Sequence, residues 1–308
     1  MPSIEIAEVI AETPDACSLV LRAPLDYRPG QYLTVHTPAG ARCYSLASSP
    51  FTDTAPKVTV KRVRDGAVSN WICDHVRAGD VLEFSAPAGT FTPDSLDDDL
   101  LLLAGGSGIT PIMGIIKSVR ARGHGDLALI YANRDPSSVI FQRELDGLLP
   151  VIHWLDSERG IPTADSLAGL LTPYLDRQAF VCGPEAFVAV AEKALQLAGV
   201  PPARIRVERF EPEPVGTRDA VATVDLDGQT HVLPWKAGKR LLDVIIDAGL
   251  NPPYSCRQGQ CGACACRLLS GEVDLVNNEV LEEEDFADGY ILACQAIPRT
   301  DAVAVTYY

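Results

Sequence analysis

The sequence predicts a chain of three parts: an antiparallel β-barrel, a doubly wound parallel α/β domain and a small α+β domain. Three observations predict this order. Short alternating strands broken by Pro and Gly fill the first third, and buried strands alternate with helices in the middle. The last segment holds a strand pair, a helix and a cluster of cysteines. A length of 308 residues suits two or three domains.

The composition limits the partners that the chain is expected to have. Apolar residues make up 47% of the chain, and the net charge is −15, which disfavours binding to nucleic acid or to an anionic membrane. The longest apolar stretch, 100–116, is interrupted by glycines, a serine and a proline, which favours strand, loop and helix over a membrane span. The N-terminus lacks the basic start of a signal peptide, so we expect a cytoplasmic protein with reduced thiols.

The first two parts are delimited by a change in pattern near residue 96. Residues 1–96 contain alternating strands such as "KVTVKRV", which favours an antiparallel barrel. Residues 97–210 contain buried strands that alternate with helices, which predicts a parallel sheet covered on both faces. The expected strands are 100–104, 127–133, 151–156 and 179–183, and the expected helices are 111–123 and 184–200.

The third part follows a short Pro-rich linker at 211–219 and runs over 220–308. It opens with two strands around an Asp-Gly turn at 220–235 and continues with a helix at 240–250. An acidic run at 281–289 is either a solvated face or a docking surface for a basic partner.

Four cysteines of the third part have the spacing of a plant-type [2Fe–2S] cluster, C-x4-C-x2-C with a distant fourth cysteine. Small neighbours such as Gly259 and Gly262 would let backbone N–H groups point at the sulfurs. A zinc site, which prefers two C-x2-C pairs, and a disulfide framework are the alternatives. The predicted ligands are Cys256, Cys261, Cys264 and Cys294. The other cysteines weighed, Cys17, Cys43, Cys73 and Cys266, are expected to be packed thiols, and the first three are isolated residues.

A glycine-rich turn in the second part is suited to a nucleotide diphosphate. A buried strand runs into Gly105, Gly106 and Gly108, and a helix then opens at Thr110 and Pro111. Glycines permit close approach of a pyrophosphate, and a helix N-terminus favours its negative charge. An ordinary strand-to-helix turn is the alternative. A second strand ends at 183, and both ends are expected to border one crevice.

The stretch "ARCYSLASSP" at 41–50 resembles the flavin-binding R-x-Y-S motif of the ferredoxin–NADP reductase superfamily. "RPGQYLTV", "GAVSNWI", "AGGSGITPI", "VCGP" and "VERF" are similar to further motifs of that family, in the same order. The resemblance implies that Arg42 binds the flavin diphosphate, that Tyr44 packs on the isoalloxazine and that Ser45 hydrogen-bonds near flavin N5. It also implies FAD rather than FMN, because the "GAVSN" loop would hold the second phosphate.

The same resemblance supplies the remaining site residues. The further residues predicted to contact FAD are Cys43, Lys61, Gly66, Val68, Ser69, Asn70 and Phe210. Those predicted to contact the nicotinamide nucleotide are Gly105, Gly106, Gly108, Thr110, Pro111, Arg134, Cys182, Gly183 and Pro184. Ser45, Cys182, Glu208 and Phe210 are predicted to act where the two rings react. Packing roles for Cys182 and Phe210, and an ion pair with Arg206 for Glu208, are the alternatives.

The order of the three parts resembles that of the reductases of bacterial multicomponent oxygenases, in which the third part is a β-grasp ferredoxin domain. The likeness is greatest to the reductases of 3-ketosteroid 9α-hydroxylases, with those of phenylacetyl-CoA epoxidases next. It implies electron transfer from NADH through FAD and the cluster to a terminal Rieske-type oxygenase, by a monomer. Asp135 beside Arg134 favours NADH over NADPH. A stand-alone NADH diaphorase and a carrier without turnover are the alternatives.

Overall fold

The computed structural model describes residues 2–64, 66–210, 218–255, 257, 259, 261–278 and 280–307. The chain divides into two compact units, Met1–Phe210 and Glu211–Tyr308. Most of the linker predicted at 211–219 lies outside the described residues. No helix in the described part of the chain is long and apolar enough to cross a membrane. The domain limits inferred from the sequence stay predictions.

The first domain is a closed antiparallel barrel, as the alternating strands predicted. Its strand order is β4-β3-β6-β1-β2-β5, and the bridge Leu46↔Val58 joins the two ends of the sheet. The strands are β1 (Ser3–Thr13), β2 (Ala16–Leu21), β3 (Tyr32–Thr37), β4 (Gly40–Ser45), β5 (Lys57–Lys61) and β6 (Val81–Phe84). Helix α1 (Ala67–His75) packs Val68 and Ile72 into the barrel core. Closure leaves the sheet no open edge.

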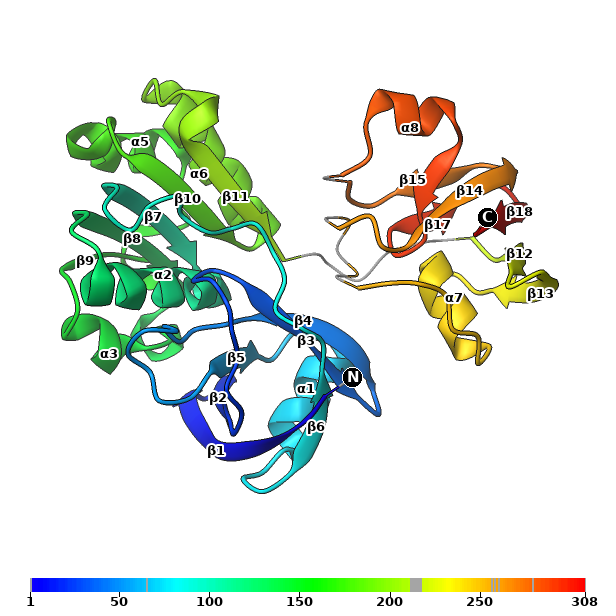
Figure 1. Cartoon of the computed structure of the whole chain (residues 1–308). Coiled ribbons are helices and arrows are strands. Elements are labelled where there is room, and N and C mark those ends of the chain that lie inside the picture. The colour runs from blue at the N-terminus through cyan, green and yellow to red at the C-terminus, as the bar shows by residue number, and fades with distance from the viewer. Residues whose placement is uncertain are drawn as a thin grey trace. The chain divides into compact units, whose positions relative to one another are not determined.

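The second domain, called the nucleotide domain after the ligand that the sequence predicts for it, is a parallel sheet with helices on both faces (Figure 1). Its strands, in the order β11-β10-β7-β8-β9, are β7 (Leu100–Gly105), β8 (Leu127–Asn133), β9 (Val151–Leu155), β10 (Gln178–Gly183) and β11 (Ile205–Arg209). The helices are α2 (Ile109–Arg122), α3 (Gln142–Asp146), α4 (Asp156–Arg159), α5 (Ala164–Leu171) and α6 (Glu185–Leu197). Short 3₁₀ turns are η1 (Gly106–Gly108), η2 (Pro136–Ser138), η3 (Thr172–Tyr174) and η4 (Pro202–Arg204). The helices expected at 111–123 and 184–200 are α2 and α6.

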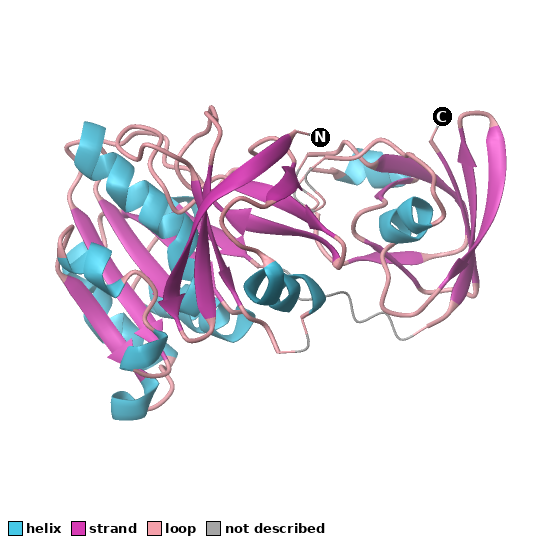
Figure 2. Cartoon of the chain, turned by 90° about the horizontal axis from the view of Figure 1, so that it is seen from below, coloured by secondary structure: helices cyan, strands magenta, loops and turns pink. Residues whose placement is uncertain are grey.

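Alternation along β7 explains why both faces need helices. Leu100 and Leu102 belong to the core under α2, whereas Leu101 and Leu103 belong to the core under α5 and α6. All four side chains are fully buried, and burial of each stabilises the fold by about 1.5–3 kcal/mol. In Figure 2 the cyan helices flank this magenta sheet, while strands dominate the barrel.

Helix α2 also joins the nucleotide domain to the barrel. Gly114 lies so close to the barrel that a Cβ there would be 2.6 Å from the Leu46 carbonyl oxygen. One turn later, the Ser118 hydroxyl donates to Ser49 Oγ at 2.9 Å. Both serines are fully buried, so this contact is part of the packed interior of the first unit.

The second unit is an α+β domain with a five-stranded sheet in the order β13-β12-β18-β14-β16. Its strands are β12 (Ala220–Leu226), β13 (Gln229–Trp235), β14 (Ala265–Ser270), β15 (Val273–Leu275), β16 (Tyr290–Leu292), β17 (Ala296–Pro298) and β18 (Ala302–Thr306). Its helices are α7 (Leu241–Asp247) and α8 (Glu283–Ala287). Asp227 and Gly228 form the predicted turn with φ of +52° and +74°, which a tight hairpin requires. Leu241, Leu242 and Ile245 of α7 pack on the sheet.

Candidate functional site

Strand β4 presents the R-x-Y-S residues on two faces of the barrel wall. Arg42 and Tyr44 share one face, with Arg42 exposed and Tyr44 half-buried, and Ser45 is buried on the other. The Cys43 thiol lies 3.3 Å from Thr34 Oγ1 on the paired strand β3. Burial raises the pKa of the Tyr44 phenol, and Arg42 opposes that shift, so the ring stays a neutral hydrogen-bonding group.

The N-terminus of α1 lies beside this strand. A Cβ on Gly40, the first residue of β4, would be 3.4 Å from Val68 Cγ2. Among the described residues no side chain caps this end of the helix, and its first residue follows Gly66. Uncapped N–H groups at a helix start are donors for a diphosphate. The Ser69 hydroxyl accepts from Val63 N and the Asn70 amide donates to Val63 O, both at 3.1 Å, so these two side chains hold the preceding turn.

A pocket of about 350 Å³ opens at the carboxyl ends of the parallel strands. Gly106 lies in it with φ of +51°, and a Cβ there would be 3.6 Å from Lys61 Nζ of the barrel. Barrel and nucleotide domain therefore share this pocket. Its lining is Lys61, Gly105, Gly106, Ala132, Asn133, Arg134, Asp156, Ile161, Pro162, Pro184, Ala186, Phe187 and Val190. Five of these, Lys61, Gly105, Gly106, Arg134 and Pro184, are residues predicted to bind a cofactor.

The remaining glycines of the motif serve close packing. A Cβ on Gly108 would be 2.0 Å from the Cys182 carbonyl oxygen, so only glycine lets η1 approach β10 this closely. A Cβ on Gly105 or Gly183 would be 2.7 Å or 2.8 Å from the Phe187 ring, which lies over both. Thr110 and Pro111 are buried, and the Thr110 hydroxyl donates to Ser107 O at 2.9 Å.

Cys182 and Glu208 are neighbours on the paired strands β10 and β11. Cys182 is fully buried, and Glu208 is 5% exposed. Burial, and secondarily the charge of Glu208, raise the pKa of Cys182, so it is a neutral thiol at pH 7. Phe210 is half-buried and packs against the core under α2.

Two acidic residues outside the predicted set shape the charge of the pocket. Asp15 pairs with Arg134 at 3.2 Å and with Lys61 at 3.8 Å, which partly neutralises the two cations of the lining. Asp156, just after β9, lines the pocket, and burial raises the pKa of its carboxyl. Asp135 instead caps η2 and accepts from Ser137 and Ser138, so its carboxylate is engaged locally.

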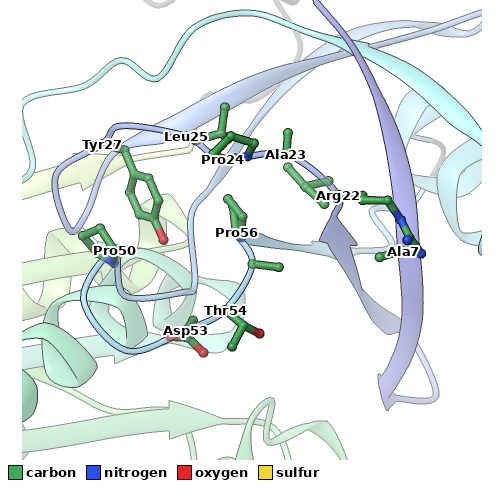
Figure 3. A pocket seen from close by; sticks show the side chains of 12 residues that line it. Ala7, Arg22, Ala23, Pro24, Leu25, Tyr27, Pro50, Asp53, Thr54 and Pro56 are labelled. Carbon is green, nitrogen blue, oxygen red and sulfur yellow. The ribbon is translucent and has the colours of Figure 1, made fainter.

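A second hollow, of about 490 Å³, lies on the barrel and contains none of the predicted cofactor residues. Figure 3 shows Tyr27 and Pro50 at one end and Arg22 with Ala7 at the other. The Tyr27 hydroxyl forms a hydrogen bond with Ser48 Oγ at 2.7 Å. This hollow is therefore separate from the nucleotide pocket.

The cysteine loop of the second unit brings two predicted ligands together. Cys264 and Cys294 are buried, and the Cys294 N–H donates to Cys264 Sγ at 3.4 Å. The neighbouring Cys264 thiol and burial raise the pKa of Cys294. Cys261 is exposed, and Cys256 lies outside the described residues. Among the residues that the structure describes, no three metal-binding side chains gather at one point.

The surroundings of these thiols suit a [2Fe–2S] cluster. Gly259 has φ of +76° and a Cβ there would be 2.7 Å from Asn277 O, while Gly262 has φ of +71°, so the loop needs both glycines. The Gln295 amide donates to Cys294 Sγ at 3.5 Å, and donors directed at sulfur are typical of iron–sulfur sites. The soft thiol donors fit iron. Cys266 is buried on β14 within the core of the second unit, and burial raises its pKa to about 12.

Arg240, which no local motif indicated, connects the cysteine loop to the segment that contains Cys294. Its guanidinium is 8% exposed and donates to Cys294 O at 3.0 Å and to Arg257 O at 3.3 Å. Gln295 also donates to Arg257 O, at 2.9 Å. The loop and the distant fourth cysteine are therefore bound to the start of one helix.

The structure also revises one prediction about the remaining cysteines. Cys17 and Cys73, expected to be isolated, are in contact, with their sulfurs 3.5 Å apart. They lie 56 residues apart in the chain, so no local spacing could have indicated the pair.

Comparison with known proteins gives matches over the whole chain. The family models that match are an oxidoreductase FAD-binding domain over residues 6–92, an oxidoreductase NAD-binding domain over 102–153 and a 2Fe-2S iron-sulfur cluster binding domain over 224–299. The ferredoxin reductase component of 3-ketosteroid-9-alpha-monooxygenase from Mycobacterium tuberculosis H37Rv is 48% identical, covering 99% of this chain and 95% of the relative. One component of the 1,2-phenylacetyl-CoA epoxidase from Escherichia coli K12 is 32% identical, covering 99% and 97%.

Among solved structures, phthalate dioxygenase reductase is similar over 99% of this chain and 97% of its own, with a TM-score of 0.77 and 26% identity. It is described as a modular structure for electron transfer from pyridine nucleotides to [2Fe–2S]. The shared length includes all three parts of this chain.

Proposed function

The chain belongs to the family of oxygenase reductases that join FAD-binding, NAD-binding and [2Fe–2S] domains in one polypeptide, and we propose that it reduces the oxygenase of a 3-ketosteroid 9α-hydroxylase. It is an oxidoreductase whose cofactors are FAD, NAD(H) and a [2Fe–2S] cluster. The observation that carries the steroid assignment is 48% identity across almost the full length of both chains to a reductase component of that name.

We propose two binding surfaces in the first unit, one for FAD at β4 and α1 and one for the nicotinamide nucleotide at the ends of the parallel strands. In our proposal Arg42 and the uncapped start of α1 bind the FAD diphosphate, with Tyr44 packed on the flavin. Ser45 and Phe210 would border the reacting ring. Held by these residues, FAD would supply the conversion of an electron pair into single electrons, and the cluster would supply one-electron transfer.

The pocket at the strand ends would hold the nicotinamide nucleotide. Gly106 would let the diphosphate approach the backbone, and Lys61 would place a positive charge beside it. Cys182 is fully buried two residues before the pocket-lining residue Pro184, and its small neutral side chain would leave room for a nicotinamide ring at the end of β10. Glu208, which is paired with Cys182 across the two strands, would orient the carboxamide group of the nicotinamide.

NADH is the proposed electron donor, because the Asp156 carboxylate in the pocket disfavours the 2′-phosphate of NADPH. The Asp156 carboxylate would accept hydrogen bonds from a ribose diol and repel a 2′-phosphate. The pairing of Arg134 with Asp15 weakens the cation that a 2′-phosphate would need.

Substitution of a predicted cluster ligand tests the electron path. We expect Cys261→Ser to abolish cytochrome c reduction by NADH while ferricyanide reduction, which can draw electrons from the flavin, stays within about twofold. The matched control is Cys266→Ala, which removes a packed thiol of the same domain and should retain both activities. Equal loss of both activities in Cys261→Ser would show that the cluster is not the exit.

Reconstitution tests the partner. NADH consumption should be coupled to steroid hydroxylation with the oxygenase of a 3-ketosteroid 9α-hydroxylase, and a phenylacetyl-CoA epoxidase oxygenase is the comparison. Greater coupling to the epoxidase would overturn the steroid assignment. The chain is proposed to work as a cytoplasmic monomer, which sedimentation of the holoprotein and cell fractionation would check.

A further inference from the structure

Two thiols of the barrel lie in contact, close to Tyr44 and on the helix whose start is assigned to FAD. Cys17 lies on β2 and Cys73 in the last turn of α1, with a distance of 3.5 Å between their sulfurs. Both side chains are half-buried, so a small oxidant can reach them. The register of β2 with β5 places Cys17 opposite Val60, and the Cys73 thiol lies 3.9 Å from the Val60 carbonyl oxygen.

Hydrogen bonding between the two thiols favours a pair with one thiolate and one protonated thiol. Contact with Cys17, and then the nearby charge of Arg62, lower the pKa of Cys73. Contact with Cys73 and burial raise the pKa of Cys17. A thiolate is the form that attacks an oxidant, so the pair consists of one attacking thiol and one protonated partner beside it.

We propose that Cys17 and Cys73 form a redox-active dithiol that closes to an intramolecular disulfide with hydrogen peroxide as the oxidant. The Cys73 sulfur attacks peroxide, the O–O bond breaks, and a sulfenic acid and one water form. The Cys17 sulfur then displaces the sulfenic oxygen as a second water, and the S–S bond forms. Two thiols lose two electrons and two protons in total, and one peroxide is reduced to two waters.

The geometry permits this closure with side-chain movement. A disulfide holds its sulfurs about 2.05 Å apart, so they must approach by roughly 1.5 Å, which rotation of the two cysteine side chains supplies. The bond would tie β2 to α1. Ser69, one helical turn before Cys73, holds the turn at Val63, so the bond would also restrain the start of α1.

This restraint has a consequence for FAD that depends on the proposed function. If the start of α1 holds the FAD diphosphate, FAD cannot leave without movement of that turn. The disulfide form is therefore the form that releases FAD more slowly, by several-fold in half-time. Formation of the disulfide itself does not depend on the FAD assignment.

The experiment uses the full-length holoprotein. Peroxide-treated protein is denatured, its free thiols are alkylated with iodoacetamide, and a non-reducing digest is analysed by mass spectrometry. We expect a cross-linked peptide pair containing Cys17 and Cys73, lighter by two hydrogens than the separate peptides and cleaved by dithiothreitol. Full alkylation of both thiols, at a peroxide dose that oxidises Cys43, would overturn the proposal.

Three variants make the result specific. In Cys17→Ser the sulfenic acid of Cys73 has no thiol partner, so dimedone should capture it. In Cys73→Ser no adduct should form at Cys17, whereas Cys43→Ser, a change in the same barrel, should leave the cross-link intact. Dimedone capture at Cys17 in place of Cys73 would overturn the assigned order of attack. An intact cross-link with unchanged FAD release would refute the placement of FAD at α1 and leave the dithiol established.

Discussion

At the scale of single residues, two carboxylates that each follow a strand of the parallel sheet make different contacts. Asp135 lies two residues after β8, and its carboxylate accepts hydrogen bonds from Ser137 and Ser138. Asp156 follows β9 and lines the pocket instead. Proximity in sequence to Arg134 therefore does not decide which carboxylate lines the pocket; the place where each strand ends does.

Replacement of Asp156 should change the choice of coenzyme. Asp156→Ser removes the repulsion of a 2′-phosphate and an acceptor for the ribose, so we expect the ratio of kcat/KM for NADH to that for NADPH to fall about tenfold or more. Ferricyanide reduction with each coenzyme measures this ratio. Asp135→Ser is the matched control and should leave the ratio unchanged. A larger change in Asp135→Ser than in Asp156→Ser would reverse the roles given to the two carboxylates.

At the scale of elements, a half-buried charge cluster attaches α2 and α3 to the barrel. Lys117 of α2 pairs with Asp53 at 3.0 Å and with Glu144 of α3 at 2.7 Å, and Lys57 of β5 pairs with Glu144 at 2.6 Å. The lysine side chains are 12% and 9% exposed. Removal of one partner would leave an uncompensated charge at this junction.

The charge cluster should make the free energy of unfolding depend on pH through the titration of Glu144. Burial acts to raise the pKa of Glu144, but the hydrogen bonds from Lys117 and Lys57 outweigh it and hold the pKa below its ordinary 4.5. A depressed folded-state pKa contributes stability that is complete above the unfolded value and is lost as the pH falls through the folded one. Glu144→Gln should therefore lower the free energy of unfolding by about 1–2 kcal/mol at pH 7, a figure reduced for the partial exposure of Glu144.

This difference between Glu144→Gln and the unsubstituted protein should shrink below pH 4.5. Urea unfolding followed by the fluorescence of released FAD measures it for the first unit. The control is Glu192→Gln, which breaks the exposed pair with Arg209 and should cost less than about 1 kcal/mol. A loss for Glu144→Gln that is equal at pH 7 and pH 4 would mean that its charge is not the cause.

The elements themselves follow from local patterns, and the contacts between them do not. Apolar runs bounded by glycine predict β7, β8 and β10 almost to their ends, and the same patterns predict α2 and α6. The short helix α5 has a local signal in its Thr163 capping box, although its eight residues are too few for a strong periodicity. Gly114 has no local signal at all, because its need for glycine arises from the barrel backbone at Leu46.

At the scale of the whole molecule, a site whose residues form a local motif can be predicted from the sequence. A contact between residues far apart in the chain cannot. The cysteine spacing and the glycine-rich turn each indicate a cofactor, because several of the residues predicted to bind it lie within one short segment. Arg240 meets Cys294 from 54 residues away, and Cys17 meets Cys73 from 56. Such contacts depend on strand order and helix packing, which cannot be read from the spacing of residues along the sequence.

The division into two compact units predicts that the electron-accepting half works alone. The cores of the barrel and the nucleotide domain lie entirely within Met1–Phe210, and the core around Trp235 lies entirely in the second unit. A fragment of residues 1–210 should therefore bind FAD and reduce ferricyanide with NADH at a rate within about twofold of the full chain, because each domain keeps its own hydrophobic core. Cytochrome c reduction should fall at least about tenfold, because the single-electron carrier is removed. Full-length Cys261→Ser is the control, since it removes the cluster and keeps the chain. A fragment that folds but lacks ferricyanide activity would mean that the second unit helps to build the flavin site and is more than an electron outlet.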